Sequence, residues 1–329
     1  MRIIRIDRGV RIVVPCKINP YLAVLGRRSN GYHDLATVMI GLDLCDTIEF
    51  RVAASPGVRL CVSSHPPWSG SWPAHASRLA VSTDGNLVER GYRETCARLG
   101  LKPACDIDLR KSIPVQAGLG GGSADAAAGI VAAFALAGHD YDASLAADVA
   151  AGVGSDVNFF LEGWTSGGWA ASCVGRGEVV SPLAVRGGVD WLLVFPAIGC
   201  ETAAVFCSLS LPVGKSNSLI GPASCEAAIE AVASGKVEAI RRVMFNGLAA
   251  AARRSNGELD EVFRAVERAA GESGVTLSGS GSTIALPCLP SESGMLAFRL
   301  SRAVQCPVRV ARLWETDSLT EQLDGVRGL

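Results

Sequence analysis

A glycine-rich stretch between a predicted strand and a predicted helix constrains this chain more than any other feature. It runs from Pro114 to Ser123, and residues 118–122 contain four glycines. Residues 106–110 before it alternate polar and apolar side chains as a strand does, and residues 124–137 after it are rich in alanine, which favours a helix. Because glycine tolerates positive φ, several N–H groups can converge beside the positive end of that helix. The stretch is therefore a candidate polyphosphate site.

The glycines of this stretch are compatible with several roles. They could serve only a tight, well-packed turn between strand and helix. The Walker phosphate loop requires a lysine before its Ser or Thr, and Ser123 follows Gly122 directly. The dinucleotide-binding fingerprint has glycine or alanine where Ser123 stands, although Asp140 lies near the distance of a ribose-binding acid. The Walker motif is thus excluded, and the dinucleotide motif is matched imperfectly.

Length and composition predict a globular α+β protein that acts on a small molecule. The chain has 329 residues, enough for one large or two ordinary domains, and 49% of them are hydrophobic. Its 31 basic and 32 acidic residues show no basic excess of the kind that indicates a nucleic-acid partner. No apolar run approaches the roughly 18 residues of a membrane span, and the N-terminus lacks a signal-peptide core. We therefore expect neither nucleic acid nor membrane among its partners.

The cysteines predict a reducing compartment. There are eleven, an odd number, and none forms a CxxC pair. Cys61, Cys96 and Cys207 lie among apolar residues, as small buried hydrophobic side chains do. With four histidines in the whole chain, metal-ligand spacing is absent. We expect a cytoplasmic protein without a cysteine or histidine metal site.

Three polar residues stand at the edges of apolar segments. Lys17 and Asn19 are separated by one residue, so both would point to the same face of a strand. A lysine that points inward is costly unless it is paired, and these residues alone favour an exposed edge strand. Asp156 precedes the apolar run 157–161, where it could cap a helix. From local sequence alone, each of the three fits a purely structural role.

The remaining pattern mixes strands and helices without repeats, which predicts an α+β fold. A strand at 10–14 is expected to end at Pro15. Periodicity predicts helices over 223–256 and 258–272, and composition predicts an exposed loop over 63–73. Asn30-Gly31 is typical of a turn, and it places the rings of Tyr32 and His33 side by side.

Taken in order, these motifs resemble those of the GHMP kinases, the family of galactokinase, homoserine kinase and mevalonate kinase. The family's phosphate loop is similar to residues 114–123, and its C-terminal glycine motif is similar to 277–283. Lys17-Ile18-Asn19 and Gly31-Tyr32-His33 resemble the branch that phosphorylates a cytidine-diphosphate-linked methylerythritol in non-mevalonate isoprenoid biosynthesis. Further segments share the resemblance: 26–28, 42–43, 46–47, 86–87, 154–157 and 175–178.

The resemblance implies a two-lobed α+β fold with the active site in the cleft between the lobes. Residues 1–167 would form an ATP-binding lobe and residues 168–329 a C-terminal lobe. The cofactors implied are ATP and Mg²⁺. The ATP-binding residues implied by the motif are Pro114, Gly118, Leu119, Gly120, Gly121, Gly122 and Ser123, and Ser123 would also lie next to the metal.

The same resemblance implies roles for the polar residues. Asp156 would accept the proton of the substrate's 2-hydroxyl, and Lys17 would keep Asp156 ionised and stabilise the developing alkoxide. Asn19 would orient the substrate. The remaining substrate-binding residues would be Tyr32 and Phe206, stacking on the cytosine, and His33, hydrogen-bonded to its edge.

The sequence departs from the family pattern at three places. Ala124 stands where a second serine is usual, Asn158 stands where proline is usual, and the 63–80 segment is individual. Two rival functions follow: a GHMP kinase acting on another alcohol such as homoserine, and a catalytically silent binding protein of the same fold. The Tyr32-His33 pair favours a substrate that carries a base. The presence of Lys17 and Asp156 favours catalysis.

Overall fold

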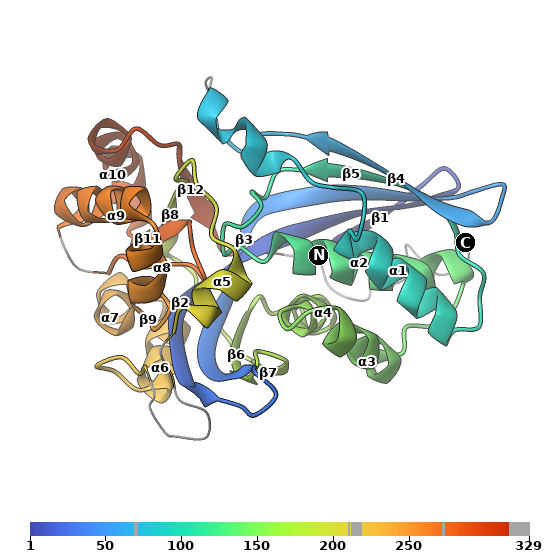
Figure 1. Cartoon of the computed structure of the whole chain (residues 1–329), viewed down its shortest axis with the longest axis horizontal. Helices are drawn as coiled ribbons and strands as arrows, with labels where there is room; N and C mark the ends of the chain where they lie inside the picture. The colour runs from blue at the N-terminus through green and yellow to red at the C-terminus, as the bar shows by residue number, and fades with distance from the viewer. Residues whose placement is uncertain (69–71, 210, 212–218, 272–273, 316–329) are drawn as a thin grey trace.

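Two long antiparallel strands, β2 (Gly9–Arg27) and β3 (His33–Val52), run through both halves of the molecule (Figure 1). The computed structural model describes residues 1–68, 72–209, 211, 219–271 and 274–315. The predicted end of a strand at Pro15 is wrong, because β2 continues through it. A shift of register between Pro15 and Cys16 marks a bulge, a position where a missing N–H is tolerated in a sheet.

The larger sheet has eight strands, most of them antiparallel. Its main path is β1 (Arg2–Ile6), β2, β3, β5 (Ala104–Lys111) and β4 (Gly57–Ser64). The strands off this path are β6 (Ala170–Gly175) on β3, β7 (Val179–Pro182) on β6, and β9 (Phe245–Asn246) on β2. The proposed division of the chain after residue 167 therefore separates β6 and β7 in sequence from the sheet that they join, and it stays a prediction.

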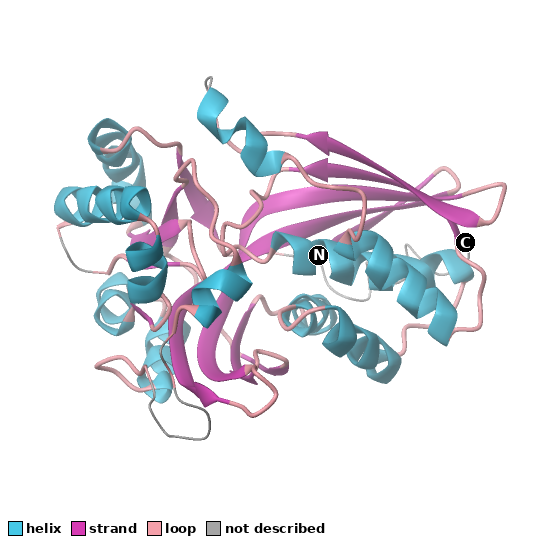
Figure 2. Ribbon diagram, in the orientation of Figure 1, coloured by secondary structure: helices cyan, strands magenta, loops and turns pink. Residues whose placement is uncertain are grey.

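Four helices cover one face of this sheet (Figure 2). They are α1 (Leu87–Arg98), α2 (Gly121–Ala137), α3 (Ala143–Val153) and α4 (Val157–Ser166). The alanine-rich α2 confirms the predicted helix, and it is buried over most of its length. Its Gly129 lies against the backbone of α1, and Gly91 of α1 lies against the backbone of α2, so that a Cβ at either glycine would collide with a carbonyl. Small side chains thus allow α2 to lie at the centre of the core.

The second half contains a four-stranded sheet in the order β10-β11-β8-β12. Its strands are β8 (Asp190–Val194), β10 (Thr276–Leu277), β11 (Ile284–Cys288) and β12 (Val308–Arg312). Its helices are α5 (Thr202–Cys207), α6 (Cys225–Ser234), α7 (Val237–Val243), α8 (Ala249–Ser255), α9 (Gly257–Ala270) and α10 (Pro290–Ala303). Among the described helices, none is long and apolar enough to cross a membrane.

The single helical segment predicted over 223–256 is wrong, because two interruptions divide it. Helix α6 ends at Gly235, which has a φ of +63° and lies against the backbone of Arg186. Between α7 and α8, Phe245 and Asn246 leave the helical conformation and pair with β2. Periodicity could not reveal a strand of two residues that depends on a partner more than 200 residues away.

The exposed loop predicted over 63–73 is partly confirmed: residues 63–64 belong to β4, residues 65–68 lie in a loop, and residues 69–71 lie outside the described residues. A 3₁₀ helix occupies Pro73–Leu79. Within it, His75 is buried and its Nε2 lies 2.9 Å from the carbonyl oxygen of Phe195 in the second half. The Trp68 ring packs 5.5 Å from the Phe195 ring. The segment therefore connects the first half of the chain to the second.

The cysteine prediction is partly confirmed. All eleven are unpaired, and Cys96 is buried as expected. Cys61 and Cys207 are exposed instead. Cys61 lies on β4, an edge strand of the larger sheet, where one face has no helix against it. Apolar neighbours in sequence do not bury a residue on the open face of a strand.

Candidate functional site

The predicted phosphate loop lines a cavity of about 450 Å³ between the two halves of the chain. Residues 114–123 form one wall, and Gly279 and Ser280 of the second glycine turn contribute another part. Lys17, Asn19 and Asp156 also line it. Residues predicted from three distant segments are therefore brought together around one space.

The loop needs glycine for steric reasons at two positions. Gly118 and Gly120 have φ of +72° and +70°, in the left-handed region that glycine adopts readily. A Cβ on Gly118 would collide with the carbonyl of Ser278, and one on Gly120 would lie 2.9 Å from Cγ of Lys17. Helix α2 begins at Gly121, so the first N–H groups of the helix, which have no partner within it, face the loop. This is the arrangement that binds an anion at a helix N-terminus.

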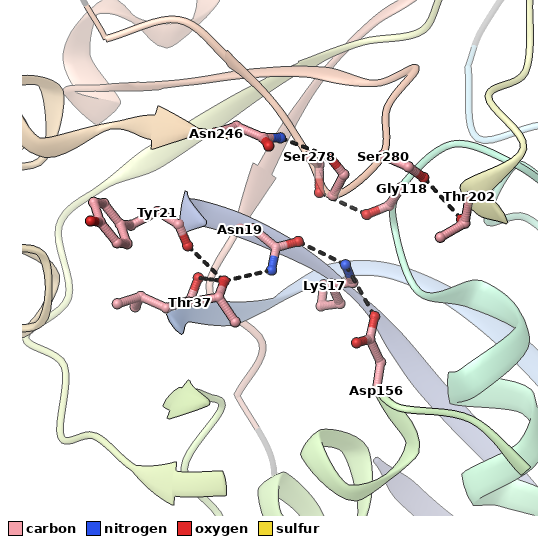
Figure 3. A network of polar contacts seen from close by, with 12 residues as sticks. Lys17, Asn19, Tyr21, Thr37, Gly118, Asp156, Thr202, Asn246, Ser278 and Ser280 are labelled. Carbon is pink, nitrogen blue, oxygen red and sulfur yellow. Dashed lines mark hydrogen bonds and ion pairs between the residues drawn. The ribbon is translucent and has the colours of Figure 1, made fainter. Parts of the chain in front are cut away.

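Lys17 is buried and has two polar partners, so the prediction of an exposed edge strand is wrong (Figure 3). Its Nζ donates to Oδ1 of Asn19 at 2.7 Å and forms an ion pair with Oδ2 of Asp156 at 3.2 Å. The amide of Asn19 in turn donates to Oγ1 of Thr37 at 2.9 Å, and that hydroxyl donates to the carbonyl of Tyr21 at 2.6 Å. The Lys17 ammonium therefore has a fixed position beside a carboxylate.

The Asp156 side chain does not cap helix α4, although the residue stands at the N-cap position. Its backbone is already helical, with φ −86° and ψ −5°, and the side chain makes no capping hydrogen bond. The carboxylate instead points toward Lys17 (Figure 3) and is 25% exposed. The Asp156 carboxylate is therefore not used to cap the helix, and it faces the cavity, where it can exchange a proton with a bound molecule.

Three residues predicted to bind a base lie at the rim of the cavity. Phe206 on α5 lines it, and the His33 ring lies 5.1 Å from the Phe206 ring. His33 is buried, and its Nε2 has no hydrogen-bond partner within the described part of the chain. Burial, followed by the charge of Arg27, lowers the pKa of His33. Tyr32 is 52% exposed. Tyr32 and His33 themselves do not line the cavity, and each reaches it through a lining neighbour, Arg176 and Phe206 respectively.

A buried charge cluster behind the phosphate loop was not predicted. Lys111 Nζ donates to Oδ2 of Asp46 at 2.5 Å and to Oδ2 of Asp125 at 2.6 Å. Oδ1 of Asp46 accepts the backbone N–H groups of Ser112 and Ile113 at 2.6 and 2.8 Å. Burial raises the pKa of Asp125 to about 8, and Lys111 offsets this only in part. The signal available in the sequence was a single acidic residue, Asp125, within the alanine-rich segment.

The second glycine turn is held against the first by side chains that the sequence did not single out (Figure 3). Oγ of Ser278 donates to the carbonyl of Gly118 at 2.8 Å. The Asn246 amide donates to two carbonyls of the turn at 2.8 and 2.7 Å. The hydroxyls of Thr202 and Ser280 lie 3.0 Å apart. The turn thus fixes one edge of the cavity.

Comparison with known proteins agrees with this geometry. The model of the GHMP kinases N terminal domain matches residues 86–163, and that of the GHMP kinases C terminal domain matches residues 228–307. A 4-diphosphocytidyl-2-C-methyl-D-erythritol kinase of Streptomyces coelicolor is 35% identical over 84% of this chain and 87% of its own length. A protein of the same name from Rhodococcus jostii is 33% identical over 93% of both chains.

Solved structures give the same result. A crystal structure of 4-(cytidine 5'-diphospho)-2C-methyl-D-erythritol kinase superposes with a TM-score of 0.70 at 29% identity, over 93% of this chain and all of that one. Homoserine kinase from Cytophaga hutchinsonii superposes with a TM-score of 0.66 at 16% identity, over 94% of this chain and 96% of that one, and shares the fold. The predicted GHMP kinase fold and the predicted kinase activity are confirmed. The chain belongs to the GHMP kinase family.

Proposed function

We propose that this ATP-dependent kinase transfers the γ-phosphate of ATP to the 2-hydroxyl of 4-diphosphocytidyl-2-C-methyl-D-erythritol, a step of non-mevalonate isoprenoid precursor synthesis. Relatives named for this activity match nearly the whole chain. The observation that carries the chemistry is the ion pair of Lys17 and Asp156, 3.2 Å apart, in the cavity that the phosphate loop lines. The eleven unpaired cysteines support a reducing, cytoplasmic setting.

Asp156 acts as the general base in this proposal. As the bond between the substrate oxygen and the γ-phosphorus forms, the hydroxyl proton passes to a carboxylate oxygen of Asp156, and ADP leaves. Lys17 keeps the carboxylate ionised and stabilises negative charge on the attacking oxygen. Asn19 fixes the Lys17 ammonium through a 2.7 Å hydrogen bond and orients the substrate. Phosphoryl transfer depends mainly on such alignment and charge stabilisation.

The phosphate loop holds the nucleotide phosphates through the N–H groups at the start of α2. Ser123 in its first turn lines the same cavity. A hydroxyl is an oxygen ligand of the kind that Mg²⁺ accepts together with phosphate oxygens and water. Ser123 would therefore lie next to a magnesium ion, which would supply neutralisation of the phosphate charge.

The base-binding end consists of Tyr32, His33 and Phe206. Nε2 of His33, which has no hydrogen-bond partner among the residues that the structure describes, has unused hydrogen-bonding capacity, which the edge of a cytosine fills. The exposed ring of Tyr32 and the lining ring of Phe206 offer faces for stacking. A substrate without a base, such as homoserine, leaves all three unused.

The proposal is tested by measuring phosphate transfer from ATP to the cytidyl substrate, homoserine and mevalonate in parallel. We expect turnover with the cytidyl substrate to exceed turnover with the other two alcohols by several orders of magnitude. Comparable or greater turnover of homoserine or mevalonate would overturn the substrate assignment. Absence of transfer to all three would favour the silent binding protein.

A further inference from the structure

Among the described residues, three cations line the cavity: Lys17, Lys111 and Arg176. Two of them are already held by carboxylates at short range. Lys17 pairs with Asp156, and Lys111 is enclosed by two aspartates. Arg176 is the third, and its side chain is 23% exposed. The motif that contains it, residues 175–178, has no part in the mechanism above.

Arg176 stands between the two ends of the proposed site. Its Cζ lies 4.8 Å from the centroid of the Tyr32 ring, at the base-binding end. A Cβ on the next residue, Gly177, would lie 3.5 Å from Oδ1 of Asp156, at the reacting end. Gly175 and Gly177 have φ of +76° and +111°, which makes the tight turn between β6 and β7 that presents Arg176.

The guanidinium of Arg176 has N–H donors that its protein contacts do not use well. Its Nε lies 3.5 Å from Oε1 of Glu178, and its Nη2 lies 3.5 Å from the carbonyl of Ala151, both long contacts. Within the described part of the chain, Nη1 makes no hydrogen bond. An arginine carries five N–H donors in a planar fork that matches phosphate oxygens. Glu178 balances the charge of Arg176 through Nε and leaves Nη1 available.

In the proposed substrate, a diphosphate lies between the cytosine and the alcohol that reacts. With the base at Tyr32 and the hydroxyl at Asp156, the diphosphate falls where the guanidinium is. We propose that Arg176 binds this diphosphate and thereby selects nucleoside-diphosphate-linked alcohols over uncharged nucleosides; the inference rests on the proposed function. It adds a binding residue for the anionic part of the substrate, next to the residues that bind the base.

The test compares cytidine diphosphate with cytidine as competitive inhibitors against the cytidyl substrate. The variants are Arg176→Met and, in case that one folds poorly, Arg176→Gln. Arg28→Met is the matched control, because Arg28 pairs with Asp34 and does not line the cavity. For wild type we expect cytidine diphosphate to bind at least tenfold more tightly than cytidine.

In the Arg176 variants we expect the inhibition constant of cytidine diphosphate to rise about 10- to 100-fold, the value for a lost charged hydrogen bond. The constant for cytidine and the KM for ATP should change less than threefold, and Arg28→Met should change none of them. The inference would be overturned by a folded Arg176 variant that loses affinity equally for cytidine diphosphate and cytidine, or for neither of them. A wild type that binds cytidine as tightly as cytidine diphosphate would also overturn it. If the inference about Arg176 fails in one of these ways while the wild type still phosphorylates the cytidyl substrate, the proposed function stands. A wild type that neither binds cytidine nor phosphorylates the cytidyl substrate contradicts the proposed function as well as the inference.

Discussion

Replacing Lys111 by methionine should destabilise the protein strongly, because it removes the cation that two buried aspartates share. The side chains of Lys111, Asp46 and Asp125 are 3%, 0% and 3% exposed. Removing one partner of a buried ion pair typically costs about 3–5 kcal/mol. Asp46 keeps two backbone N–H donors, but Oδ1 of Asp125 already has no partner among the described residues. We expect a loss within that range.

The stability lost in Lys111→Met should also depend on pH. Burial raises the pKa of Asp125 to about 8, whereas an unfolded aspartate titrates near 3.9. Between these two pKa values the folded state holds a proton that the unfolded state does not, so this contribution to stability falls as the pH rises through that interval and is lost above the folded pKa. Without Lys111 the pKa of Asp125 rises further. The free-energy difference between Lys111→Met and wild type should consequently be larger at pH 9 than at pH 6.

Urea denaturation measures the effect. With a slope of roughly 3 kcal/mol per molar urea, the upper end of the usual range, the midpoint should fall by about 1–1.7 M. Lys102→Met is the control, because Lys102 is exposed close by in sequence, and it should change stability by less than about 0.5 kcal/mol. Lys111→Met combined with Asp125→Leu should recover part of the loss. A midpoint shift below about 0.3 M for Lys111→Met would refute the reasoning.

Three further predictions concern activity. Asp156→Asn should lower kcat by about 10²–10⁴-fold, the usual contribution of a general base, with nearly unchanged ATP affinity. A variant that keeps more than a tenth of the wild-type rate contradicts the assignment of Asp156 as the base. Gly120→Val should raise the KM for ATP, because Gly120 has a φ of +70° and a Cβ there would lie 2.9 Å from Lys17 and 3.0 Å from Phe160. Unchanged nucleotide affinity in a folded variant would indicate that the loop serves packing and does not bind phosphate. His33→Ala should raise the KM for the cytidyl substrate roughly 5- to 100-fold, with the KM for ATP and the melting temperature nearly unchanged, whereas lost stability with intact substrate affinity would indicate a structural residue.

The phosphate loop and helix α2 could be predicted from sequence because their causes are local. Glycine permits the positive φ at Gly118 and Gly120, and consecutive alanines favour a helix that packs closely. Both effects act within a few residues of the chain. The predicted strand, loop and helix accordingly appear in order, with α2 beginning at Gly121.

The pairing of charges could not be predicted in this way, because partners lie far apart in sequence. Lys17 meets Asp156 only after β2 and the start of α4 are brought together, and Lys111 meets Asp46 across the larger sheet. Local rules therefore placed Lys17 on an exposed edge and Asp156 at a helix cap. Only the resemblance to a family indicated their joint role. Asn246, which holds the second glycine turn from within a predicted helix, had no such signal at all.

The second half of β2 also has a consequence for the time course of folding. Tyr21 and Leu22 pair with Phe245 and Asn246, about 220 residues later in the chain. At a synthesis rate of roughly 5–20 residues per second, the apolar end of β2 is synthesised roughly 10–45 s before its partner. During that interval its unpaired edge is open to pairing with other chains. The nascent protein therefore depends on protection of this strand until nearly three quarters of it has been made.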